Sequence, residues 1–182
     1  MKTQRVFLFL LIVMMLAVTS CRSRTDRSEG TVVLSVTDFD KLPVSVSAST
    51  GPFQIGQVTL KSFFKDPSVM DAMGHQLEGI ELQRYEITYR RLDKGTRTPP
   101  PSVQGIFGLV APLGTVQLDN LVFMTTDQTL NQPLKDLITL GRDSETGTTV
   151  ITLDVTLRFF GRTISGDDIA SEPATFTIEV TP

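Results

Sequence analysis

The feature of the sequence that most constrains its fold is the stretch from Thr148 to Phe159. Every second residue in it is apolar or threonine, and the members of that set are Thr149, Ile151, Leu153, Val155, Leu157 and Phe159. The positions between them are polar except Val150. A period of two over so long a run predicts a β-strand with one buried and one solvated face. Residues 174–180 repeat the pattern and predict a second such strand.

Six more segments are predicted to be strands from their alternation and β-branched or aromatic content: 31–37, 44–48, 57–64, 80–91, 103–110 and 115–124. Within 80–91 the apolar residues change parity near Gln83 and Arg84, which predicts a β-bulge there. Leucines at helical spacing predict at most one short helix, near 133–140. The fold class is therefore all-β, an antiparallel β-sandwich of about eight strands, with a barrel as the alternative.

The predicted sandwich resembles the immunoglobulin-like and fibronectin-type sandwiches in architecture only. The Cys…Trp…Cys pattern of antibody domains is absent, because the chain has one cysteine and no tryptophan. Residues 31–182 are expected to form a single β-sandwich domain, with its extra length in the segments 65–79 and 125–147.

The single cysteine, Cys21, follows a basic start and an apolar run from Val6 to Val18. Thirteen apolar residues fit the core of a secretion signal and are too few to span a bilayer, which needs roughly 20. The segment Val18-Thr19-Ser20-Cys21 resembles the lipobox of bacterial lipoproteins. The alternatives are an ordinary signal peptide that leaves Cys21 a free thiol, and an uncleaved short anchor.

The lipoprotein resemblance implies that residues 1–20 are a signal peptide and that the Cys21 thiol carries diacylglycerol. It also implies acylation of the new amino terminus, with chains such as palmitate. Arg22 stands where many inner-membrane lipoproteins have aspartate, so the resemblance favours the outer membrane over the inner one. Residues 21–30 are polar beyond the cysteine and are predicted to be a flexible tether.

Charge argues against nucleic acid as a partner. Without residues 1–20, which hold two basic residues and no acid, the chain has 15 basic and 20 acidic residues, a net charge of −5. An acidic chain of this kind does not favour general binding to phosphate backbones.

The sequence contains no constellation typical of catalysis. There is no G-x-S-x-G, and His75 is the one imidazole, interpreted as a surface-loop residue. Zinc sites need several His or Cys ligands, so no zinc or other cofactor is expected. Paired acids in turns, Asp38 with Asp40 and Asp167 with Asp168, are weak candidates for calcium, although acids also favour turns for their own sake.

A cluster of basic residues is the remaining candidate for a binding patch. It spans 14 residues and comprises Arg84, Arg90, Arg91, Lys94 and Arg97. Such a patch suits a phosphate, a lipid headgroup or an acidic partner, and the alternative is a set of solvated residues that shield a sheet edge. The sequence thus favours a non-catalytic envelope lipoprotein that binds or assembles with an envelope protein. The alternatives are a glycan-binding module and a calcium-dependent module or hydrolase that uses loop carboxylates.

Overall fold

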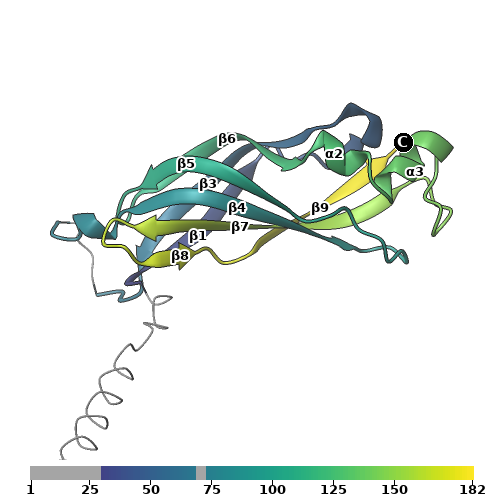
Figure 1. Cartoon of the computed structure of the whole chain (residues 1–182). Coiled ribbons are helices and arrows are strands. Elements are labelled where there is room, and N and C mark those ends of the chain that lie inside the picture. Colours follow the sequence, from purple (N-terminus) through teal and green to yellow (C-terminus); the bar gives the residue numbers. More distant parts are fainter. Residues whose placement is uncertain (1–29, 69–72) are drawn as a thin grey trace, which may run out of the picture.

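The computed structural model describes residues 30–68 and 73–182, and most of these residues lie in strands (Figure 1). The elements follow in the order β1 (Val32–Asp40), β2 (Ser45–Ser47), η1 (Ala48–Thr50), β3 (Phe53–Phe64), η2 (Gln76–Glu78), β4 (Ile80–Arg91), β5 (Ser102–Val110), β6 (Thr115–Met124), α2 (Thr126–Thr129), α3 (Leu134–Leu140), β7 (Ile151–Thr163), β8 (Asp168–Ala170) and β9 (Ala174–Thr181). The all-β prediction is confirmed.

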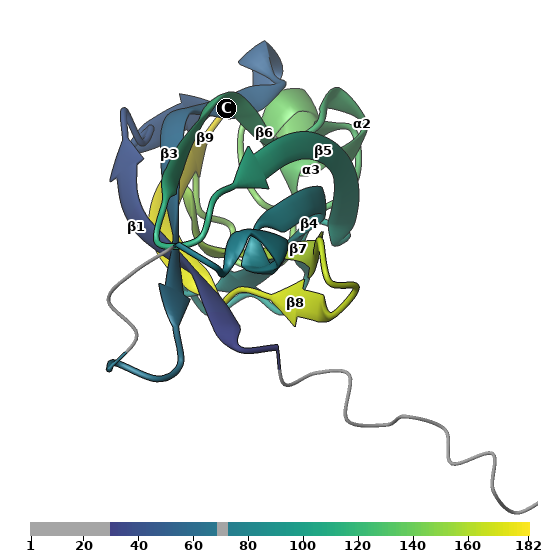
Figure 2. The same cartoon turned by 90° about the vertical axis from the view of Figure 1, so that its left-hand side faces the viewer.

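The strands form two sheets. One has the order β1-β3-β6, and the other has the order β2-β9-β7-β4-β5, with β8 also paired to β7. Seen end-on in Figure 2, the strands curl around a common interior. The pairing is antiparallel except that β2 runs parallel to β9, so the prediction of a wholly antiparallel arrangement is wrong at this edge. The three-residue β2 follows the turn at Lys41, whose φ is 55°, and lies along the last described strand.

The interior is built from the inward-facing residues of both sheets. In β7 the residues Ile151, Leu153, Val155, Leu157 and Phe159 are all fully buried, as the alternation predicts. Aromatic rings join the two sheets: the ring of Phe176 on β9 lies 5.4 Å from that of Phe123 on β6 and 5.6 Å from that of Phe39 on β1. Burial of these side chains, each contributing roughly 1.5–3 kcal/mol, holds the sheets together.

The longest strand is displaced from its predicted bounds. β7 begins at Ile151 and not at Thr148, because the Thr148 carbonyl accepts a hydrogen bond from the Asp143 amide at 2.8 Å and belongs to the preceding loop. It continues past the predicted end to Thr163, because Gly161 fits closely against the backbone of β4.

The predicted bulge is confirmed. The register between β4 and β7 shifts between Leu82 and Arg84, so that β4 carries an extra residue at Gln83. Gln83 and Arg84 are both exposed, and the inward alternation resumes at Tyr85.

The helix predicted near 133–140 is present as α3, which ends at Gly141 with φ 67°. The limit of one helix is wrong, because α2 precedes it. α2 has no apolar period, but a capping box forms at its start, where the side chains of Thr125 and Gln128 each bond the other residue's backbone.

Gly161 is a test of the close contact between β4 and β7. A Cβ atom on this residue would lie 2.4 Å from the carbonyl oxygen of Glu81, so Gly161→Ala forces the two strands apart. We expect a loss of roughly 1–3 kcal/mol in the free energy of unfolding, measured by urea titration. Gly105→Ala is the control, since a Cβ there meets nothing within 4 Å. Equal stability of the two variants would contradict this packing.

Candidate functional site

The five residues of the predicted basic patch do not form one surface. Arg90 and Arg91 are neighbours in β4, so their side chains point to opposite faces. The Arg90 side chain is 75% exposed and pairs with Asp154, whereas that of Arg91 is 2% exposed. Arg84 lies six residues earlier in β4, with its guanidinium 4.6 Å from the ring centre of Phe160.

Lys94 and Arg97 lie in the connection from β4 to β5, where Arg97 Nη1 donates to Gln132 Oε1 at 2.9 Å. Including Arg91 in an exposed patch was wrong. Its alternation with Arg90 places it under the loops that follow β4 and not in solvent.

The buried Arg91 is the centre of an ion network. Its Nε and Nη2 atoms donate to the two carboxylate oxygens of Asp93, each at 2.6 Å. Nη2 also donates to Asp143 Oδ2 at 2.9 Å, and Nη1 lies 3.6 Å from Glu145 Oε2. The bidentate geometry is the strongest form of an arginine–carboxylate pair.

The same acids fasten two loops to each other. Glu145 accepts hydrogen bonds from the Thr96 amide and hydroxyl and from the Arg97 amide. Asp143 accepts from the hydroxyl and amide of Thr146. The loop 92–101 is thereby joined to the loop 141–150. Gly95 packs directly over the guanidinium, since a Cβ there would lie 2.0 Å from Arg91 Cζ.

The network changes the acidity of its members. Hydrogen bonds from Arg91 lower the pKa of Asp93 below its usual 3.8. Burial alone would raise the pKa of Asp143, but hydrogen bonds from Thr146 and Arg91 outweigh it and the net shift is downward. The Thr96 hydroxyl and the backbone amides of Arg97 and Thr96 lower the pKa of Glu145. The network therefore holds its carboxylates ionised and is structural in character.

In the Asp167–Asp168 turn, the candidate for calcium, one carboxylate is already paired with an arginine side chain. Arg162 Nε donates to Asp168 Oδ1 at 2.9 Å, and the Asp167 amide donates to the Thr163 hydroxyl at 2.8 Å. Across residues 30–68 and 73–182, no three His, Cys, Asp or Glu residues gather in a way that would hold a metal ion. The ring of His75 lies 4.9 Å from that of Phe64.

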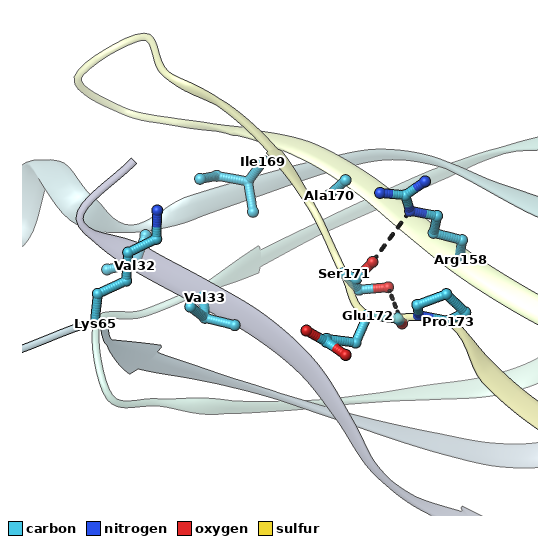
Figure 3. A pocket seen from close by; sticks show the side chains of 9 residues that line it. All are labelled: Val32, Val33, Lys65, Arg158, Ile169, Ala170, Ser171, Glu172 and Pro173. Carbon is cyan, nitrogen blue, oxygen red and sulfur yellow. Dashed lines mark hydrogen bonds between the residues drawn. The ribbon is translucent and has the colours of Figure 1, made fainter. Parts of the chain in front are cut away.

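A small groove lies where β1, β8 and the start of β9 meet (Figure 3). It has a volume of about 280 Å³. On one side of it Arg158 Nε donates to the Ser171 carbonyl at 3.2 Å, and the Ser171 hydroxyl donates to the Glu172 carbonyl. Lys65 and Val33 line the opposite side. The groove combines both signs of charge with apolar walls and shows no nucleophile beside a base.

The outer face of β5 is the largest uncovered apolar feature on a strand of the described chain. Val103 and Leu109 are more than half exposed, and Phe107 is 100% exposed. The residues alternate, so they share one face. Ile164 continues this surface, because its Cδ1 atom and that of Leu109 both lie within 4 Å of the Cβ position of Gly79.

β5 also forms an edge of its sheet. It pairs with β4 on one side, and although only Ala111–Gly114 separate it from β6, that strand belongs to the other sheet. A groove of about 470 Å³ runs between the two, lined by 104–107 and 117–122. Two tyrosines of β4 span the sheets here: the Tyr85 hydroxyl donates to the Val122 carbonyl at 2.8 Å, and that of Tyr89 donates to the Phe123 carbonyl.

The comparisons with known proteins identify no relative: no family model, no curated protein and no solved structure matches the chain. None of them therefore indicates a catalytic activity. Among the described residues, no helix has both the length and the apolar character required to cross a bilayer.

Sequence reasoning named Arg91 but missed Asp143 and Glu145, which lie about 50 positions away and are drawn in by the fold. It also missed the β5 face, because residues 103–110 are apolar on both parities and predict burial on both sides. Tyr85 and Tyr89 are four residues apart and therefore point to the same face of β4. This spacing was the indication in the sequence of a contact between the sheets.

Removal of the Arg91 charge tests the network. Arg91→Met leaves three acids without their cation, and we expect a loss of roughly 3–5 kcal/mol in the free energy of unfolding by urea titration. Arg90→Met is the matched control on the exposed face, with an expected change of at most about 1 kcal/mol. A small effect at Arg91 would show that the loops are held by other contacts.

Acidification tests the same site by linkage. A carboxylate whose pKa is lowered by folding contributes stability above its unfolded pKa, near 3.8 for Asp93 and Asp143, and this contribution is lost as the pH falls through the lower folded value. The urea midpoint is therefore expected to fall below about pH 4. Asp93→Asn should show a shallower fall, and an unchanged acid dependence in that variant would count against the assignment.

Proposed function

We propose that the chain is a lipid-anchored lipoprotein of the bacterial cell envelope, whose β-structure acts by binding or assembly and not by catalysis. The observation that carries the proposal is the position of Cys21, the one cysteine of the chain, at the end of a lipobox-like Val-Thr-Ser-Cys after 13 apolar residues. Cys21 lies outside the described residues, so the support comes from the sequence.

The anchor follows from the chemistry of the acylated cysteine. Each acyl methylene buried in a membrane contributes about 0.8 kcal/mol, and one chain alone holds only marginally. Diacylglycerol on the thiol together with an acyl chain such as palmitate on the amino group gives stable attachment. Residues 21–30 serve as the tether, residues 31–182 as a single domain, and Arg22 favours the outer membrane.

A binding role is supported by the uncovered face of β5. Apolar side chains that are exposed together mark interaction surfaces more often than scattered ones do. Phe107, with no part of its side chain covered, is the prominent member of the set. The calcium-dependent alternative has less support, because the Asp168 carboxylate already accepts a hydrogen bond from Arg162.

The finer architecture belongs to the same proposal. We assign the two sheets to the two layers of an immunoglobulin-like sandwich. Separate hydrogen-bond ladders, apolar inner faces and the contact between Phe123 and Phe176 across the layers support it.

Metabolic labelling tests the anchor. Cells that express the full chain and receive labelled palmitate should incorporate the label into the wild-type protein, and the N-terminal peptide should have the mass of an acylated cysteine. Cys21→Ser should lose the label and leave the membrane fraction, whereas Ser20→Ala, which keeps a small residue before the cysteine, should retain both. Equal labelling of Cys21→Ser and the wild-type protein would contradict the proposal.

A further inference from the structure

The end of the molecule at which the described chain begins carries exposed apolar side chains from three segments that are far apart in sequence (Figure 2). Leu77 belongs to η2, Leu109 to the end of β5, and Ile164 to the turn that follows β7. The Leu77 side chain is 62% exposed, and the other two are about half exposed. These three residues are called the apolar tip below.

Backbone hydrogen bonds hold the segments of the apolar tip together. The Ser165 amide donates to the Leu77 carbonyl at 2.8 Å. The Ile164 amide donates to the Gly79 carbonyl at 2.9 Å. Leu109 lies beside Ile164, because the Cδ1 atoms of both are within 4 Å of the Cβ position of Gly79. The tip is therefore one contiguous surface, and exposed apolar patches mark interaction surfaces more often than scattered residues do.

The chain enters the domain beside the apolar tip. The Thr31 hydroxyl donates to Glu78 Oε2 at 2.6 Å, and Glu78 is the neighbour of Leu77. Gly30 is buried against Ile169, since a Cβ atom on the glycine would lie 2.5 Å from Ile169 Cδ1. The point at which the tether reaches the domain is thus fixed next to the tip.

We propose that the apolar tip docks on the membrane that holds the Cys21 anchor, with its three side chains inserted among the lipid headgroups. The inference rests on the lipid anchor of the proposed function, and it names the surface of the domain that faces the bilayer. Apolar side chains bind such an interface through the area that they bury in it. The anchor assists, because it holds the tip at a high effective concentration beside the lipid.

The lengths of the tether and of the domain decide which end meets the membrane. Nine residue steps separate Cys21 from Gly30, and they reach at most about 32 Å when fully extended. β7 alone has 13 residues, and at 3.3 Å per residue it is about 40 Å long. An orientation with α3 and the far end on the membrane, and the tip pointing away, would need a longer tether (Figure 1).

The charges around the apolar tip favour a neutral bilayer surface. The described parts of segments 65–81 and 162–168 form this end, and they contain five acids and two bases: Lys65, Asp66, Glu78, Glu81, Arg162, Asp167 and Asp168. Arg162 is already paired with Asp168 at 2.9 Å. The tip therefore suits zwitterionic headgroups, and attraction to anionic lipid does not drive the docking.

A fluorophore on the full, lipid-anchored chain tests the contact. Leu77→Cys labelled with an environment-sensitive fluorophore, in vesicles of phosphatidylcholine, should be quenched at least ~twofold by lipids with nitroxide-labelled acyl chains. Leu140→Cys is the matched control, since Leu140 is 61% exposed and lies in α3 at the far end, and its label should stay unquenched. Acylation occupies the Cys21 thiol, so the wild-type chain gives the background of labelling.

A charge in the apolar tip tests whether its apolar side chains make the contact. Leu77→Asp, added to labelled Ile164→Cys, should remove most of the quenching without lowering the melting temperature, because a carboxylate resists transfer out of water. Leu140→Asp, added to the same labelled variant, should leave the quenching unchanged. Replacement of part of the lipid by anionic phosphatidylglycerol should not increase it, and an increase would overturn the apolar contact.

Equal quenching at Leu77→Cys and Leu140→Cys would overturn the proposal, as would an unquenched label at Leu77→Cys in a chain that carries palmitate. A blue-shifted emission that the lipid-borne quenchers leave unchanged would identify a protein surface, such as a second copy, as the occupant, and would also overturn it. The two proposals fail distinguishably. Palmitate labelling with an unquenched tip leaves the anchor standing, whereas absence of the palmitate label removes the anchor and the docking that rests on it.

Discussion

The placement of Arg91 is the constraint on which one end of the molecule depends. A buried guanidinium is costly to desolvate, and it is tolerated only when its donors are all matched. Asp93, Asp143 and Glu145 supply the match, and in doing so they fix two long loops against the end of β4. The hydrophobic interior alone would not order these loops, because they contribute few apolar residues to it.

Contacts within the sheets and contacts between the sheets use different groups. Within each sheet, backbone hydrogen-bond ladders join the strands, as between β3 and β6 and between β4 and β7. Between β4 and β6 the hydroxyl groups of Tyr85 and Tyr89 replace a ladder by donating to carbonyls of β6. β5, which is near to β6 in sequence, does not pair with it, and a groove lined by residues of both strands lies between them.

The strands were predictable because their alternation is a local property. β7 and β9 have their inward residues as expected, and the bulge in β4 follows from a change of parity that the sequence displays. The partners of Arg91 were not predictable, since nothing local to Asp143 or Glu145 distinguishes them from other loop acids. The parallel pairing of β2 likewise depends on where β9 passes, which is set by the whole fold.

The two tyrosines have a consequence for how the molecule can be observed. The chain has no tryptophan, and both of its tyrosines are in β4 and reach across the interior. Its tyrosine fluorescence therefore originates at the contact between the sheets, and burial raises the pKa of Tyr85 to about 12. The protein thus carries a built-in optical reporter of sheet separation.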